Sequence, residues 1–127
     1  MNHKEFIEQV RDRAGMFGLN GSYYPTAMFL QGFDIARCGG LLRGFTEWLV
    51  VRKGECSSFN WLASVFDEAL PGVGVRHLKN GLTPDQDQQA VDHLFSLVLE
   101  FLDVRDDPRQ LARMYARYEA LYAQTIG

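Results

Sequence analysis

The chain has few cysteines and no cluster of metal ligands. Cys38 and Cys56 are the only two cysteines in 127 residues, and no CxxC motif or nearby histidine pair accompanies them. Disulfide-stabilised secreted domains and zinc sites both need several closely placed ligands. We therefore expect two free thiols, no metal site and no cofactor.

The sequence also has no long apolar run. Its first thirteen residues, MNHKEFIEQVRDR, contain no apolar segment of the kind found in signal peptides. No window approaches the roughly 20 consecutive apolar residues of a membrane span. These two absences predict a cytoplasmic protein that has no membrane partner.

Positive charge and familiar catalytic motifs are missing too. The formal net charge is −3 at pH 7, whereas nucleic-acid binding requires a positive field that displaces counterions. There is no GK[ST] phosphate loop and no GxSxG nucleophile motif. His3, His77 and His93 share no helical face. We expect neither an enzyme nor a nucleic-acid-binding protein, and the same charge argues against a helix-turn-helix regulator in residues 43–70.

What the chain does have is helical periodicity in apolar residues from one end to the other. The composition is that of an ordinary globular protein, with 46% hydrophobic and 23% charged residues. The pattern predicts an all-α fold, a single domain over residues 1–127 made of about six helices.

The expected helix boundaries follow from capping and stop residues. The first helix is expected to end near Arg13. The second has Pro25 in its first turn and is stopped by Gly39-Gly40, and the third covers about 42–53. The fourth helix is capped by Ser57 or Ser58 and ends at Pro71-Gly72. The fifth runs from Thr83 to about Val104, and the sixth begins at Asp107-Pro108.

A glycine-rich segment, RDRAGMFGLNGSYYP, follows the first helix. Its spacing is GxxGxxG after a helix, whereas a dinucleotide fingerprint is GxGxxG directly after a strand. We interpret Gly15, Gly18 and Gly21 as turn residues that supply positive φ angles and close backbone approach. Tyr23 and Tyr24 beside this turn are expected to be exposed, as aromatic anchors for a partner protein.

Residues 71–83, PGVGVRHLKNGLT, form the longest irregular stretch. Loops of this length are often functional. The segment contains Arg76, His77 and Lys79 and no acidic residue, so an alternative function is a small-ligand-binding or regulatory module. In that alternative the three side chains would meet an anion in an aromatic pocket between helices.

Two charged stripes occupy the last two expected helices. Asp92, Glu100 and Asp103 lie on the polar stripe of the fifth, and Asp106 and Asp107 follow. Three arginines, at positions 109, 113 and 117, repeat along the sixth. Such stripes are most often solvated or paired with each other. The other interpretation is a partner-binding surface, in which the five acidic residues meet a basic protein.

Four local motifs resemble those of a family of small bacterial proteins. RAGMFG is similar to an RPGMYxG motif, MFLQGFDIA to an FLxGY helix, and GFTEWLVVRKGECSSFNW to an FxxWL…SSxxW block. The apolar acidic segment HLFSLVLEFLD follows in the same order. The chain departs from the pattern at Ala14, where proline is usual, and at Phe17, where tyrosine is usual.

The resemblance implies a function in protein binding. Some members of this RPGMY-type group look like immunity proteins of polymorphic-toxin or contact-dependent systems. A member would be a rigid helical protein that neutralises a partner toxin by surface complementarity. The resemblance implies no catalytic residues, and neither it nor the composition specifies an oligomeric state.

Overall fold

The computed structural model describes residues 2–126, with side chains described as far as Gln124, and it is an all-α bundle. The fold class predicted from the sequence is therefore confirmed, and no strand occurs within these residues. The six helices are α1 (His3–Asp12), α2 (Tyr23–Ala36), α3 (Phe45–Lys53), α4 (Trp61–Ala69), α5 (Pro84–Arg105) and α6 (Pro108–Ile126). None of them has the length and apolar character needed to cross a membrane.

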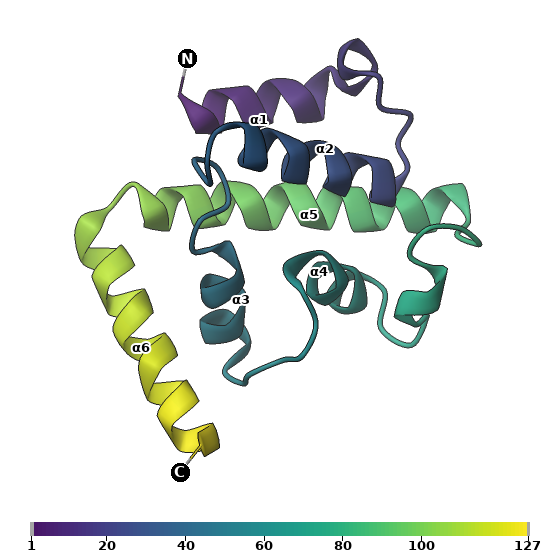
Figure 1. Ribbon diagram of the computed structural model, residues 1–127. Coiled ribbons are helices and arrows are strands. Elements are labelled where there is room, and N and C mark those ends of the chain that lie inside the picture. The colour runs from purple at the N-terminus through teal and green to yellow at the C-terminus, as the bar shows by residue number, and fades with distance from the viewer. Residues whose placement is uncertain (1, 127) are drawn as a thin grey trace.

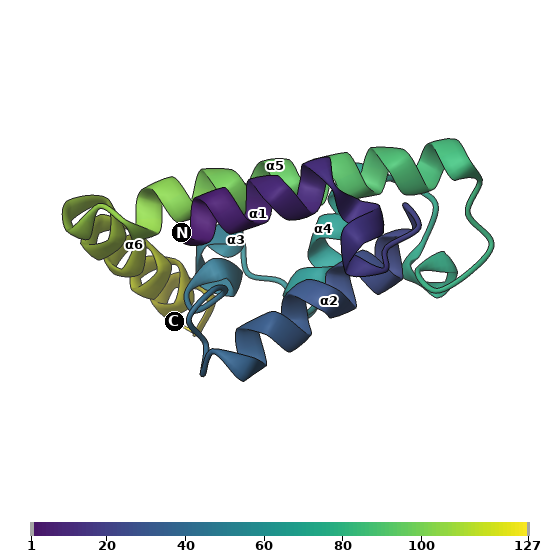
Figure 2. The same cartoon turned by 90° about the horizontal axis from the view of Figure 1, so that it is seen from above.

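Helix α5 is the central helix of the bundle. It contacts each of the other five helices. Figure 1 shows α1 and α2 on one side of it and α3 and α4 on the other, while α6 turns away from its end and packs along α3. The view from above confirms that α6 leaves the body at the end where the N-terminus lies (Figure 2).

The sequence of α5 explains this central position. Thr83 Oγ1 accepts a hydrogen bond from the Gln86 amide, and Gln86 Oε1 accepts one from the Thr83 amide, which together form a capping box at the expected start of the helix. Pro84 occupies the first helical position, where its missing N–H costs nothing. The helix then buries eight residues: Ala90, Val91, Leu94, Phe95, Leu97, Val98, Phe101 and Leu102.

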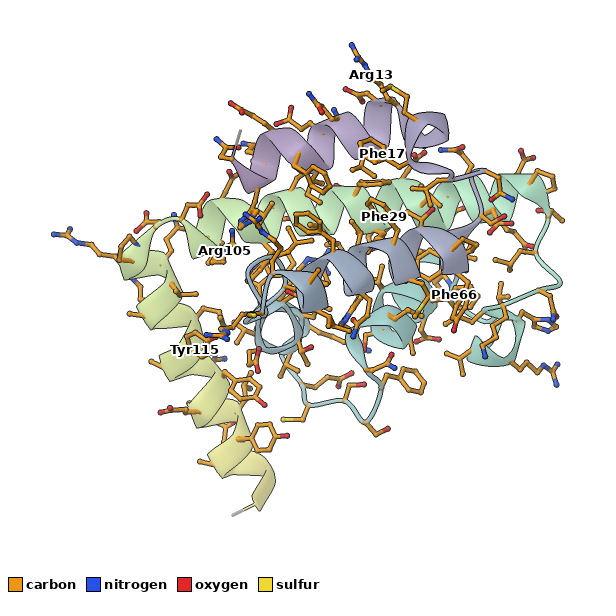
Figure 3. All side chains as sticks on the ribbon, turned by 45° about the horizontal axis from the view of Figure 1, so that its top comes forward. Arg13, Phe17, Phe29, Phe66, Arg105 and Tyr115 are labelled. Carbon is orange, nitrogen blue, oxygen red and sulfur yellow. The ribbon has the colours of Figure 1, made fainter. Side chains whose placement is uncertain are left out.

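The glycine-rich segment bends the chain between α1 and α2. Residues Ala14–Phe17 form one 3₁₀ turn, and Gly18 ends it at φ 76°. The turn packs the Phe17 ring against those of Phe6 and Phe29, with centroid distances of 5.9 and 5.6 Å. Phe17 and Phe29 are labelled in Figure 3. The predicted turn is confirmed, and it attaches α1 to α2 through aromatic edge-to-face contacts.

The detailed roles assigned to the three glycines are only partly right. Gly18 and Gly21 have positive φ angles, but Gly15 does not. The expected close backbone approach is wrong, because a Cβ atom at any of the three would meet nothing within 4 Å. The amide of Tyr23, at the start of α2, donates to Asp87 Oδ1 at 2.8 Å. A carboxylate therefore already occupies the helix N-terminus that an anion would use.

Two predicted boundaries need correction. Helix α4 is capped by Asn60, whose Oδ1 accepts from the Ala63 amide at 2.8 Å, so Ser57 and Ser58 are not the cap. Helix α2 begins at Tyr23, so Pro25 lies in its first turn as predicted, but the helix ends at Ala36, three residues before Gly39. The 71–83 segment is not wholly irregular, because Val75–His77 forms a short 3₁₀ helix.

Candidate functional site

The outer side of α5 carries a row of exposed carboxylates, which we call the acidic face: Asp92, Glu100, Asp103 and the C-cap residue Asp106. At 100° per residue the first three lie within about 80° of one another around the helix. Asp92 and Asp103 are separated by about 16 Å along its axis. The sequence prediction that these residues share one face is consistent with this spacing, and all of them are exposed.

Positive charge reaches the acidic face only at one end. Lys4 Nζ of α1 lies 3.0 Å from Asp103 Oδ1, and this hydrogen bond raises the pKa of the lysine. Asp92 accepts a hydrogen bond from the neutral Gln88 amide at 2.7 Å. Glu100 has no ion pair or hydrogen bond with any side chain in the described residues. The centre of the face is therefore an uncompensated negative surface.

Asp107 has a different role from the one predicted. Its Oδ1 accepts from the backbone amides of Arg109 at 3.0 Å and Gln110 at 3.3 Å, so it caps the N-terminus of α6. Hydrogen bonds from the Gln110 side chain and backbone hold the pKa of the Asp107 carboxyl below its usual value. We therefore exclude Asp107 from the acidic face.

A groove between α4 and α5 adjoins the acidic face. It has a volume of about 400 Å³ and is lined by Glu68, Gln89, Asp92, His93 and Ser96. Glu68 comes from α4 and forms an ion pair with Arg52 of α3. The groove therefore places a second carboxylate opposite Asp92. Sequence reasoning missed Glu68, because only tertiary packing brings α4 against α5.

His93 forms part of the floor of this groove. Its Nε2 is buried and has no hydrogen-bond partner among the described groups. Glu68 Oε1 is the nearest acidic atom, at 3.5 Å, too long for a good hydrogen bond. A buried polar atom without a partner costs roughly 1–3 kcal/mol. The groove thus contains a buried imidazole nitrogen whose nearest acidic partner is the Glu68 carboxylate.

The expected exposure of Tyr23 is wrong. Its side chain is completely buried, and its hydroxyl donates to the Leu62 carbonyl oxygen at 2.7 Å, which joins α2 to α4. Tyr24 is half-buried, and Lys79 Nζ lies 5.3 Å from the centroid of its ring. Tyr23 is a core residue. Tyr24 lies near the 71–83 loop and is not among the residues that line the groove between α4 and α5.

The three basic residues of the 71–83 loop do not converge on one site. Lys79 lines a depression of about 190 Å³ together with Tyr24 and Asp87. Arg76 Nε lies 3.3 Å from His77 Nε2, and neither residue lines that depression. Because Asp87 brings a carboxylate into it, the depression lacks the purely cationic lining expected for an anion.

The arginine stripe of α6 is exposed. Within the described part of the chain, no ion pair joins Arg109, Arg113 or Arg117 to an acidic residue. The stripes on α5 and α6 therefore do not neutralise each other by direct pairing.

Comparison with known proteins gave no relative. No family model matches the chain, and neither a curated protein nor a solved structure is detectably similar to it. Among residues 2–126 there is also no group of three or more histidine, cysteine, aspartate or glutamate side chains placed to hold a metal ion.

Proposed function

We propose that this chain is a non-enzymatic protein that binds another protein through its acidic face, and that it acts as an immunity protein which neutralises a basic toxin. The observation that carries the proposal is the uncompensated negative charge at Asp92 and Glu100. A basic partner surface would complement that charge and associate faster because of it.

The acidic face works against the stability of α5, which supports a role in recognition. Glu100 and Asp103 are like charges at i and i+3, a spacing that costs about 0.2–0.5 kcal/mol in a helix. Asp103 and Asp106 also lie at the C-terminal end of α5, where the helix dipole disfavours negative charge. Departures from local stability rules are concentrated at functional sites.

The groove gives the proposed interface a point of specificity. A lysine or arginine side chain entering between Glu68 and Asp92 would have two carboxylates to donate to. Glu68 is already paired with Arg52, so Asp92 is the carboxylate of the two that has no charged partner among the described residues.

A charge-reversal experiment tests the proposal. Asp92→Lys with Glu100→Lys changes the net charge by +4 at exposed positions without basic partners. Asp103→Lys is a less clean choice, because the new lysine would lie beside Lys4. The control is Glu55→Lys with Glu119→Lys, which makes the same charge change at exposed residues outside the acidic face. Because Glu55 Oε1 lies 3.7 Å from Lys53 Nζ, this control also removes an exposed ion pair, and it is therefore the more demanding test of folding.

The tagged proteins are used for affinity capture from the native cell at low and high salt, and their folding is checked by circular dichroism. We expect the wild type and the control to capture a basic protein whose retention falls with salt, and the acidic-face variant to lose it. The captured protein should be toxic when expressed alone and harmless when co-expressed with the wild type. Equal capture by both variants, or a captured protein without toxicity, would contradict the proposal.

A further inference from the structure

We propose that the corner where the α2–α3 connection meets α5 and α6 is a binding site for a small organic anion, a carboxylate or phosphate attached to a compact apolar body. The site is separate from Asp92, Glu100 and Asp103 of the acidic face, and only Asp106 of that face lies near it. Arg105 and Asp103 are two positions apart on α5, so they project about 200° apart around the helix.

An open depression of about 320 Å³ lies at this corner, near the lower end of the size range of small-molecule sites. Its walls are the backbone of residues 38–40, the Leu111 side chain and the Tyr115 ring, and its charged lining residues are Arg43 and Arg105. No carboxylate is among the lining residues. Arg105 and Tyr115 reach it from α5 and α6, respectively (Figure 3).

Arg105 is held rigidly in the wall. Its Nη1 donates to the carbonyl oxygens of Gly40 at 2.5 Å and Leu41 at 2.7 Å, and its Nη2 lies 2.7 Å from His3 Nδ1. Asp106 Oδ1 lies 3.8 Å from Arg105 Nε, but this carboxylate is two-thirds exposed. The guanidinium therefore remains a fixed positive charge that is only weakly compensated.

Two further arginines reinforce the positive charge. Arg43 Nη2 donates to the Cys38 carbonyl oxygen at 3.1 Å, which leaves its Nε and Nη1 donors available. No carboxylate lies within ion-pairing distance of Arg37 or Arg43 in the described residues. The positive charge also acts on the neighbouring His3 imidazole. Burial, then Arg105 and then Arg37 lower the pKa of this imidazole, while Asp106 raises it.

The chemistry of the walls specifies the class of ligand. A guanidinium offers paired donors that match a carboxylate or phosphate. The Tyr115 hydroxyl, which makes no hydrogen bond within the described part of the chain, offers another donor, and its ring and Leu111 offer apolar contact. Burial and then Glu47 raise the pKa of Tyr115, while Arg43 lowers it. The phenol is therefore protonated at neutral pH and able to donate.

Four probes at constant ionic strength test the site: benzoate, phenyl phosphate, inorganic phosphate and neutral benzamide. Binding is measured by the shift in thermal unfolding midpoint and by NMR titration of the amides of residues 38–44. We expect benzoate, phenyl phosphate or both to bind with saturation, and benzamide to be inactive. The relative affinities of the two aryl anions distinguish a carboxylate ligand from a phosphate ligand.

Two exposed arginines provide the matched variants. Arg43→Gln removes the available guanidinium donors of Arg43, and Arg109→Gln removes an arginine of α6 outside the site. We expect the affinity for the bound aryl anion to fall about tenfold or more in Arg43→Gln, as the loss of a charge-assisted hydrogen bond predicts. Arg109→Gln should bind as the wild type does.

Three results would overturn the inference. The first is no saturable binding of either aryl anion. The second is equal affinity in Arg43→Gln and wild type, because the anion would then be elsewhere. The third is inorganic phosphate binding as tightly as phenyl phosphate, because the apolar walls would then contribute nothing. Each variant's midpoint shift is taken from its own ligand-free value, so a change in basal stability does not affect the comparison.

Discussion

The Tyr23 hydroxyl is a structural link whose loss should show both at neutral pH and in alkali. It is completely buried and donates to the Leu62 carbonyl oxygen at 2.7 Å, across the contact between α2 and α4. In Tyr23→Phe the ring remains and only the hydroxyl is removed. The Leu62 carbonyl, within α4, still accepts the helical hydrogen bond from four residues later, so no buried group is left unsatisfied. We expect the free energy of unfolding to fall by about 0.5–1.5 kcal/mol at pH 7.

The same residue should make the protein sensitive to high pH. Burial raises the pKa of the Tyr23 phenol well above its ordinary value. In the unfolded chain the phenol titrates near pH 10. The unfolded state therefore loses a proton that the folded state keeps, so stability is complete below about pH 10 and falls as pH rises above it. The slope contributed by this residue approaches about 1.4 kcal/mol per pH unit.

Urea unfolding followed by tryptophan fluorescence measures both effects. Wild type and Tyr23→Phe are compared between pH 7 and pH 11.5, with Tyr24→Phe as the control, since it removes a neighbouring half-buried phenol. The difference between wild type and Tyr23→Phe should shrink above pH 10 and reverse in sign between about pH 10 and pH 11. A difference that stays constant across this range would refute the reasoning, because the Tyr23 phenol would then ionise equally in both states.

Two further predictions concern the helix ends. Asp107→Ala should lower the free energy of unfolding by about 0.5–2 kcal/mol by removing the cap of α6; Asp107→Asn should retain most of it in the same thermal unfolding assay. Gly44→Ala should lower the free energy of unfolding more than Gly54→Ala does. Both glycines have positive φ angles, but only a Cβ atom at Gly44 would lie 2.8 Å from an atom outside its own helix, Tyr115 Oη. Equal losses in the two glycine variants would show that α6 moves aside freely.

Helix α5 could be predicted from the sequence because all its determinants are local. The capping box, the proline in the first turn and the apolar residues are contained in one stretch of the chain. The start of α4 could not, because Ser57, Ser58 and Asn60 are all competent caps. In the structure Ser57 Oγ accepts from the Phe59 amide at 3.1 Å and Asn60 is the cap. The Trp61 indole, at the first position of α4, donates to Gln31 Oε1 of α2 at 2.9 Å, a tertiary contact that no local pattern contains.

The candidate site could be predicted only in part, because the sequence pattern contains the local determinants and not the tertiary ones. The acidic face follows from the helical spacing of residues on α5 alone. The burial of Tyr23 does not, because it depends on a hydrogen bond to a residue 39 positions later. The proposed anion site at the corner of α5, α6 and the α2–α3 connection depends on hydrogen bonds from Arg105 to backbone carbonyls 64 and 65 positions earlier. No local pattern contains that information, and the glycines of the α2–α3 connection indicated only a helix stop.

The small net charge of the chain conceals two surfaces of opposite sign on one helix. Negative charge lies on the outer side of α5, and Arg105 projects from its opposite side toward Arg43. A helix with its side chains is about 10–12 Å across, which is comparable to the Debye length of about 8 Å at physiological ionic strength. Asp106 lies 3.8 Å from Arg105 Nε and couples the two surfaces at that end, whereas Asp92 is about 20 Å from Arg105 along the helix axis and is largely screened from it at physiological salt. A basic protein at the acidic face and a small anion at the corner could then bind together, and lowering the salt should strengthen both interactions.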